Sequence, residues 1–249
     1  MLKKILSVAI VFFFSFQADA SYLSKYVNTY NLGSNSNSGI FVQDIDTKEV
    51  LYKKNSQQPL NPASILKTLV LGASYLVLGD DYQFETALYK DNDEIYLKLG
   101  ADALLSQSDL NNLFSQLKEK YPNFEIKKVY IDDSIIEKAS YPSTWLEEDK
   151  WPNQREITPY VVDDNYFEIS IKRSSLATKV DIIQDGDYKL PIINELTLGE
   201  KQDFTIERLY GDDSSIVTLK GTIKEDVTLK LPVLKPEINF KIKVKNSIA

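Results

Sequence analysis

The alternation of apolar and polar residues predicts a hairpin followed by a long apolar helix near the start of the chain. Residues 39–55 are predicted to form the hairpin, because two short alternating runs flank a polar turn. Residues 61–78 are predicted to form the helix, with Pro62 near its start and Gly79 after its end. Apolar residues occupy nearly every face of this helix, so we expect it to be buried in a domain centre.

Strands and a helix alternate in the next segment. The pattern predicts strands at residues 82–89, 94–99 and 128–131. An amphipathic helix is predicted over residues 109–120, with its inward side chains at Leu110, Leu113, Phe114 and Leu117. Residues 141–159 are rich in Trp, Pro and acidic residues, and are predicted to form an irregular connection.

β-Branched alternation dominates after Asn165. Strands are predicted at residues 167–172, 179–183, 204–210, 215–223, 227–231 and 238–244. The fold class is therefore predicted to be α+β. We divide the chain into a mixed part, residues 21–165, and a separate β-rich part, residues 166–249.

The first twenty residues have the pattern of a secretory signal peptide. Lys3 and Lys4 precede an apolar run over residues 5–16, and Ala18 and Ala20 supply small residues before a cut. The run is short for a transmembrane helix, which needs about 20 apolar residues. The residue after the expected cut is Ser21 rather than cysteine. We therefore expect a periplasmic protein with neither a lipid anchor nor a transmembrane anchor.

The amino-acid composition excludes several classes of function and of site. The net charge is -7, and an acidic chain repels nucleic acid backbones. The sequence has no cysteine and no histidine. Thiol chemistry, Ser-His-Asp hydrolases and the usual zinc sites are thereby excluded. A nucleophilic hydroxyl in this chain must be activated by a lysine, a carboxylate or an amine.

Ser64 and Lys67 are the candidate nucleophile and base. They form a Ser-x-x-Lys motif at the start of the predicted apolar helix. Three residues apart on a helix, their side chains lie on one face, so the amine can reach the hydroxyl. Burial among apolar neighbours would favour the neutral amine, which can accept a proton. The start of the helix also offers free N–H groups to an oxyanion.

The motif alone leaves a structural alternative open. Ser64 could be a helix-capping serine and Lys67 a lysine that extends along apolar surface. The chain also holds a second copy of the motif, Ser115 and Lys118, on the polar side of the predicted amphipathic helix. We interpret that copy as two surface residues.

The surroundings of Ser64 carry a family resemblance. Segments 61–67 and 78–86, with the hairpin before them, resemble the class C penicillin-binding proteins, which are D-alanyl-D-alanine carboxypeptidases and endopeptidases. The likeness continues through residues 100–106, 131–134, Trp145 with its acidic neighbours, and 158–165. Ala101 and Ala103 stand where the family usually has glycine and proline.

The resemblance implies a fold and a reaction. Residues 21–165 would form the N-terminal part of a penicillin-binding/β-lactamase-like serine transpeptidase fold, and residues 166–249 a β-rich inserted domain. Lys67 would take the proton of Ser64, which attacks a carbonyl of a peptidoglycan stem peptide; water then releases the acyl-serine. β-Lactams are expected ligands, and no metal or organic cofactor is implied.

The resemblance also implies a Ser/Lys-x-Asn element and a Lys-Thr-Gly strand, and we identify neither. Lys220-Gly221-Thr222 has the right residues in the wrong order, and is predicted to be a strand followed by a turn glycine. Without these elements an apolar helix face and a strand edge would be uncovered, unless a second chain supplies the rest.

Three alternatives remain at this point. The first is a non-catalytic truncated homologue that binds peptidoglycan or a partner chain. The second is a β-lactamase, which fits less well because those compact enzymes have no β-rich insertion. The third is a glycosidase that uses adjacent acids such as Asp132-Asp133 or Asp163-Asp164, but adjacent carboxylates point in different directions and these pairs flank turns.

Overall fold

The structure is a computed structural model. It describes residues 25–26, 37–137, 141–143, 145–146, 150–152, 154–174, 179–208 and 216–248. The expected signal peptide lies outside these residues. The chain divides into two compact units, Met1–Tyr82 and Gln83–Ala249, and each is described by itself.

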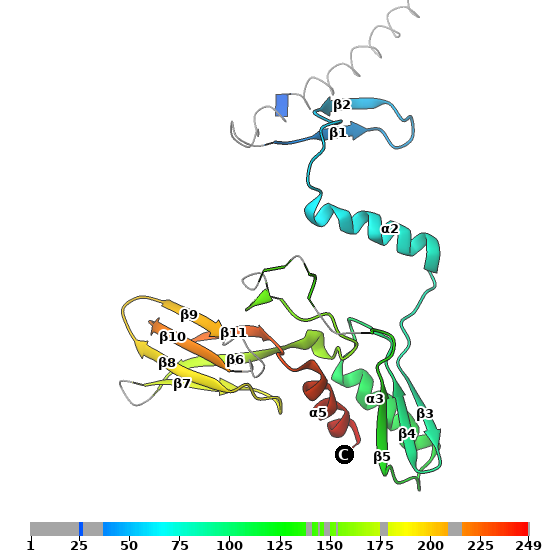
Figure 1. Cartoon of the computed structure of the whole chain (residues 1–249), viewed down its shortest axis with the longest axis vertical. Coiled ribbons are helices and arrows are strands. Elements are labelled where there is room, and N and C mark those ends of the chain that lie inside the picture. The colour runs from blue at the N-terminus through cyan, green and yellow to red at the C-terminus, as the bar shows by residue number, and fades with distance from the viewer. Residues whose placement is uncertain are drawn as a thin grey trace, which may run out of the picture. The chain divides into compact units, whose positions relative to one another are not determined.

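Residues 37–82 of the first unit contain a hairpin and a helix (Figure 1). Strands β1 (Ile40–Gln43) and β2 (Val50–Lys54) pair antiparallel, as predicted. The turn between them is held by the Asp44 carboxylate, which accepts from the backbone N–H groups of Asp46 and Thr47. A 3₁₀ turn, η1 (Ala63–Ile65), then leads into helix α2 (Leu66–Leu78).

Helix α2 has no buried residue, so the prediction of a buried helix is wrong. Leu76 and Val77, for example, are 84% and 81% exposed. A helix is buried by packing against another layer. The described residues of the first unit supply only a two-stranded hairpin, which is too little to cover a helix that is apolar all round.

The second unit begins with a three-stranded sheet covered by two helices. Its strands are β3 (Ala87–Asp91), β4 (Glu94–Lys98) and β5 (Lys128–Asp132), in the order β3-β4-β5. Helix α3 (Gln107–Lys120) connects the parallel strands β4 and β5. Helix α5 (Pro236–Ile248) packs beside α3. The shared core contains Ile95, Leu97, Phe114 and Phe240, all fully buried.

The buried face and the first residue of helix α3 both follow from its sequence. Leu110, Phe114 and Leu117 are buried and Leu113 is partly buried, as the amphipathic pattern predicted. The helix starts at a capping box in which Ser106 accepts from the Asp109 N–H and the Asp109 carboxylate accepts from the Ser106 N–H.

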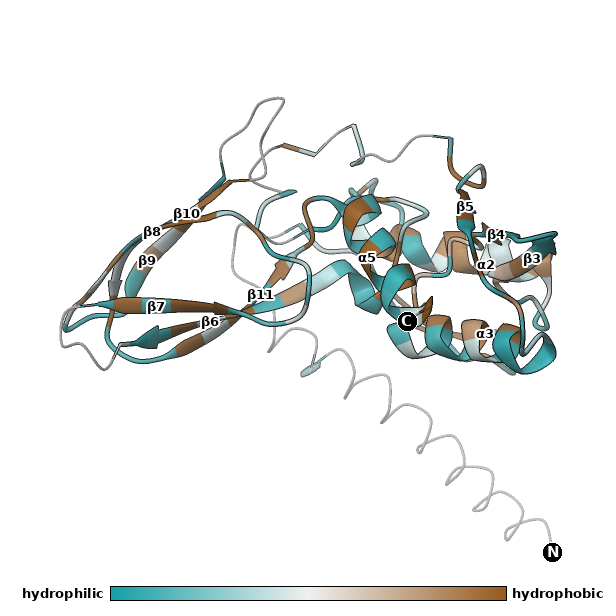
Figure 2. Ribbon diagram, turned by 90° about the horizontal axis from the view of Figure 1, so that it is seen from below, coloured by the Kyte–Doolittle hydropathy of each residue, from teal (hydrophilic) through white to brown (hydrophobic). Residues whose placement is uncertain are grey.

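The β-rich part is a sandwich of two three-stranded sheets. One has the order β11-β6-β7 and the other β8-β10-β9. The strands are β6 (Tyr166–Arg173), β7 (Val180–Gln184), β8 (Ile192–Leu198), β9 (Asp203–Arg208), β10 (Val217–Ile223) and β11 (Val227–Pro232). Hydrophobic stretches on both sheets, brown in Figure 2, form one core that includes Ile169, Ile171, Val217 and Leu219.

Three details of the prediction are corrected. Residues 238–244 belong to α5 rather than to a strand, because Phe240 and Val244, four residues apart, are buried on one helix face and Pro236 opens the helix. Strand β8 was not predicted. The strand predicted at residues 82–89 is β3, which starts later, at Ala87. The predicted α+β class is confirmed.

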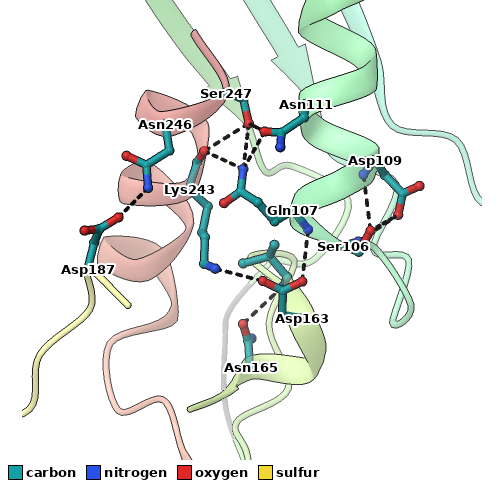
Figure 3. Close-up of polar contacts among 11 residues, drawn as sticks. Ser106, Gln107, Asp109, Asn111, Asp163, Asn165, Asp187, Lys243, Asn246 and Ser247 are labelled. Carbon is teal, nitrogen blue, oxygen red and sulfur yellow. Dashed lines mark hydrogen bonds and ion pairs between the residues drawn. The ribbon is translucent and has the colours of Figure 1, made fainter. Parts of the chain in front are cut away.

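A polar cluster joins α3, α5 and the turn η2 (Asp163–Asn165) (Figure 3). Asp163 accepts from the Gln107 N–H at 3.0 Å and from Lys243 Nζ at 2.8 Å. Gln107 Nε2 donates to Ser247 Oγ at 2.7 Å. Burial opposes ionisation of Asp163, but the bonds from Lys243 and Gln107 outweigh it and lower the pKa of this carboxyl.

Asn165 is the buried last residue of that turn. Its side chain accepts from the Val162 N–H and donates to the Tyr160 carbonyl, and no part of the residue is exposed. Its own carbonyl accepts from the Val233 N–H at 2.8 Å, which ties the start of β6 to the end of β11. Asn165 has a φ of 51°, in the left-handed region that asparagine tolerates better than most residues.

Candidate functional site

Ser64 lies in a short, constrained turn immediately before α2. The Asn61 side chain accepts from the Ala63 N–H at 3.1 Å, and the Ile65 N–H donates to the Pro62 carbonyl at 2.9 Å. Ala63 has a φ of 42°, which is unfavourable for a residue with a Cβ. Such strained positions cluster at functional sites. The backbone directly before Ser64 is therefore held in an uncommon conformation.

The Ser64 side chain does not cap the helix. Pro62 and Ile65, which precede η1 and α2, make no capping bond through their side chains, and the side chain that accepts from the first N–H of η1 is that of Asn61. The structural alternative for this serine, a helix-capping role, is thus not observed. Its hydroxyl remains available for another partner.

Ser64 and Lys67 line the same apolar groove, which has a volume of about 430 Å³. The other residues that line it are Ala63, Leu66, Val70 and Leu71. Both candidate side chains are exposed, so the described residues do not bury the Lys67 amine as the sequence analysis expected. A ligand that enters this groove contacts a hydroxyl, an amine and an apolar wall.

The helix end next to Ser64 is electrostatically suited to an anion. The first turn of α2 holds no acidic residue, and the positive end of the helix dipole lies here, although the Leu66 N–H already donates to carbonyls of η1. An oxyanion formed beside Ser64 would be stabilised there.

The second Ser-x-x-Lys copy occupies a different environment. Ser115 and Lys118 are exposed residues of α3, which begins at Gln107, well before Ser115. Ser115 therefore has no helix terminus beside it. This placement agrees with the interpretation of the second copy as surface residues.

The other segments that carry the resemblance build the framework of the second unit. The Gly100 N–H donates to Thr86 Oγ1 at 3.2 Å, and a Cβ on Gly100 would lie 2.4 Å from the Glu85 carbonyl oxygen. Glycine is therefore required for this close approach. Tyr160 donates to Asp133 at 2.6 Å; burial, with this bond, raises the pKa of its phenol.

Two Lys-x-Asn triplets were overlooked in the sequence. Lys53-Lys54-Asn55 ends β2, where Asn55 donates to the Ser38 carbonyl at 3.2 Å. Lys90-Asp91-Asn92 forms the β3–β4 turn, where Asn92 has a φ of 51°. Both asparagines have the left-handed backbone of turn residues. Both triplets match the Lys-x-Asn sequence pattern, but in each of them the asparagine is explained by its place in a turn.

Lys220-Gly221-Thr222 lies inside β10, so the prediction of a turn glycine is wrong. Gly221 pairs with Leu196 of β8 and Phe204 of β9. A Cβ at this position would lie 2.4 Å from the Asp203 carbonyl oxygen. Glycine is needed here because neighbouring backbone approaches it closely.

The paired acids have structural partners where they are described. Asp132 accepts from the Ser134 N–H, and Asp163 from Lys243 and Gln107. Two further acidic runs in the sequence, residues 147–149 and 212–213, lie outside the described residues. Among the residues that the structure describes, no three acidic side chains converge in a way that could hold a metal ion, and no helix has the length and apolar character needed to cross a bilayer.

The sequence of this chain is similar to a known protein family and to a known protein. Residues 20–228 match the D-Ala-D-Ala carboxypeptidase 3 (S13) family. A D-alanyl-D-alanine carboxypeptidase of Actinomadura sp. (strain R39) is 27% identical over 121 residues, which are 45% of this chain and 22% of that protein.

A solved structure shows the same fold. Penicillin binding protein 4 from Haemophilus influenzae matches 92% of this chain with a TM-score of 0.71 and 18% identity. The match covers 53% of that protein's chain, so this chain spans about half its length.

Proposed function

Since this chain belongs to the D-Ala-D-Ala carboxypeptidase 3 (S13) family, we propose that it acts on peptidoglycan stem peptides through an acyl-enzyme at Ser64. Lys67 is the proposed base. The observation that carries the proposal is that these two side chains line one groove at the positive end of α2. The reaction is cleavage at the D-alanyl-D-alanine terminus or at the cross-link.

The reaction has two halves. Ser64 Oγ transfers its proton to the neutral Lys67 amine and attacks the peptide carbonyl, whose oxyanion is stabilised by N–H groups at the helix end. Lys67 then gives this proton to the leaving amine as the peptide C–N bond breaks. Water then attacks the acyl-serine. One proton of this water passes through Lys67 to Ser64 Oγ, and the shortened peptide departs with a free carboxylate.

Turnover also requires that the Lys67 amine be shielded from bulk solvent. A lysine acts as a base when burial disfavours its ammonium form, and Lys67 is exposed among the described residues. A cover over the apolar side chains of α2 would supply that burial. We propose that further polypeptide, on this chain or a second chain, provides it in the active protein.

The proposed location is the periplasm, after removal of residues 1–20. The apolar run preceded by Lys3 and Lys4 supports this. N-terminal sequencing of the exported protein tests it: cleavage would leave Ser21 as the first residue.

Labelling with a fluorescent penicillin tests the catalytic proposal, because a β-lactam traps the acyl-serine. We expect the wild type to be labelled, Ser64→Ala to be unlabelled, and Ser115→Ala to be labelled like the wild type. Ser115 is the matched control, since it has the same motif on an exposed helix face. Intact mass should rise by one β-lactam in the labelled proteins. A folded wild type without label, or equal label on Ser64→Ala, would refute the proposal.

A non-catalytic role in binding peptidoglycan or a partner chain is the second candidate. It is favoured by the exposure of α2, whose apolar side chains are free to dock a ligand. In that case Ser64→Ala should bind purified peptidoglycan as tightly as the wild type, and neither protein should be labelled.

A further inference from the structure

Strand β5 is an edge strand in the sheet β3-β4-β5. Its inner side pairs with β4 in parallel register, with Tyr130 opposite Tyr96. No described strand pairs with its outer side. An open edge of this kind is a template for another strand, because its outward N–H and C=O groups have no ladder partner.

The charges along this edge are arranged symmetrically. Residues 127–133 read Lys-Lys-Val-Tyr-Ile-Asp-Asp, with two cations before Tyr130 and two anions after it. In an antiparallel pair centred on Tyr130, Lys128 of one copy lies opposite Asp132 of the other, and Val129 lies opposite Ile131. The same contacts occur twice, as in any two-fold interface. Opposite charges directly across a strand pair stabilise it, and like charges destabilise it.

The backbone of β5 is oriented for this pairing. The Asp132 carbonyl accepts from the Leu99 N–H at 3.0 Å, so it faces β4. Backbone groups of successive strand residues point to alternate sides. The N–H and C=O groups of Val129 and Ile131 therefore face the open edge. Placed opposite each other across a two-fold axis, these two residues can exchange both N–H···O bonds.

A largely apolar groove lies beside the open edge of β5. This groove, of about 770 Å³, is bounded by Val129, Tyr130 and Ile131 of β5 and by Val244 and Ile248 of α5, among others. Val129 and Ile131 are partly buried against the core below α5. On the other face, Tyr130 stacks on Tyr96 with ring centroids 4.9 Å apart. A strand added to β5 would thus extend both an apolar layer and an aromatic row.

We propose that two copies of this chain associate through β5, which forms an antiparallel pair with its symmetry mate and joins two three-stranded sheets into one. The charge pattern selects this partner, because a copy of the same strand supplies an anion for each cation in antiparallel register. Lys128 and Asp132 carry the contact. Lys128 donates to the Tyr130 hydroxyl and Asp132 accepts from the Ser134 N–H, so among the described residues both have only neutral hydrogen-bond partners within the chain. Lys127 is already in an ion pair with Asp93, and Asp133 accepts from the partly buried Tyr160 hydroxyl, so these outer charges contribute less.

Charge reversal in the purified chain tests the proposal, with sedimentation velocity as the measurement. We expect the wild type to be a dimer. Lys128→Glu places two like-charge pairs across the interface and should raise the dimer dissociation constant about tenfold or more. Lys128→Glu combined with Asp132→Lys reverses the pattern and should restore dimerisation. Lys224→Glu, an exposed lysine between β10 and β11, is the matched control for net charge and should remain dimeric.

Hydrogen exchange of the edge amides provides a second measurement. The N–H groups of Val129 and Ile131 should be protected in the wild type and should exchange faster in Lys128→Glu. A wild type that stays monomeric at all concentrations overturns the proposal. So does a dimer that Lys128→Glu leaves intact. Protection of these amides in a monomer would mean that a segment of the same chain covers the edge, which also overturns it.

Discussion

The two units of this chain differ in where their apolar side chains lie. In the second unit the sheet and helices bury Phe114 and Phe240 completely, and the polar groups between the elements are paired. In the first unit the candidate nucleophile precedes a helix with no buried residue. The second unit therefore buries an apolar core of its own, whereas the described part of the first unit leaves the apolar side chains beside Ser64 exposed.

The largest effect is expected in the core of the second unit. Phe114→Ala removes a fully buried ring between the sheet and α5. We expect it to lower the free energy of unfolding by about 3–5 kcal/mol, because lost transfer energy and a cavity add together. Urea unfolding followed by circular dichroism measures it. A loss below about 1 kcal/mol would show that this core is not the source of stability.

The next effect concerns buried polar groups. Asn165→Ala leaves the Val162 N–H and the Tyr160 carbonyl unpaired, at a cost of about 1–3 kcal/mol for each group. Asn92→Ala is the control, because Asn92 has the same φ of 51° in an exposed turn. The difference between the two variants in urea unfolding isolates the buried hydrogen bonds. Equal losses would mean that backbone strain alone explains the effect.

A smaller, pH-dependent effect is expected at Asp163. Its pKa is lowered in the folded state, so the stabilisation is present above the unfolded pKa of about 4 and is lost as pH falls through the folded pKa. Asp163→Asn should lower the free energy of unfolding by about 1 kcal/mol or less at pH 7. Thermal unfolding from pH 7 to pH 2 should show the two proteins converging in acid. A gap that stays constant with pH would contradict this assignment.

The smallest effect is expected in α2. Leu76 is 84% exposed, so Leu76→Ala should change the free energy of unfolding by less than about 0.5 kcal/mol. The measurement is the same urea titration as for Phe114→Ala, which removes a buried side chain. A loss above about 2 kcal/mol would show that α2 is covered in solution, and would remove the contrast between the units.

The sequence predicted local structure well where one pattern dominated. The hairpin at residues 39–55 and the inward face of α3 follow from turn chemistry and from apolar spacing. It failed at α5, where apolar residues alternate from Ile238 to Val244 as in a strand. There Pro236 and Glu237 at the helix start were the better signal.

The candidate site was only partly predictable. The spacing of Ser64 and Lys67 predicts a shared helix face, and both line one groove. The exposure of that groove could not be predicted, because burial depends on which layers meet, and hydropathy along the chain does not specify the partner of a helix. The assignment of Ser64 and Lys67 as nucleophile and base stays a prediction until labelling tests it.

The bond between the Asn165 carbonyl and the Val233 N–H has an evolutionary consequence. The β-rich sandwich leaves the sheet-and-helix core at Tyr166 and returns at Pro232, and these two residues face each other across the β6–β11 pair. Insertions are tolerated where the ends of the inserted piece lie close together. The sandwich thus leaves the core and returns to it at one place, and we expect a shorter loop to be tolerated there, at the loss of the bond from Asn246 of α5 to Asp187.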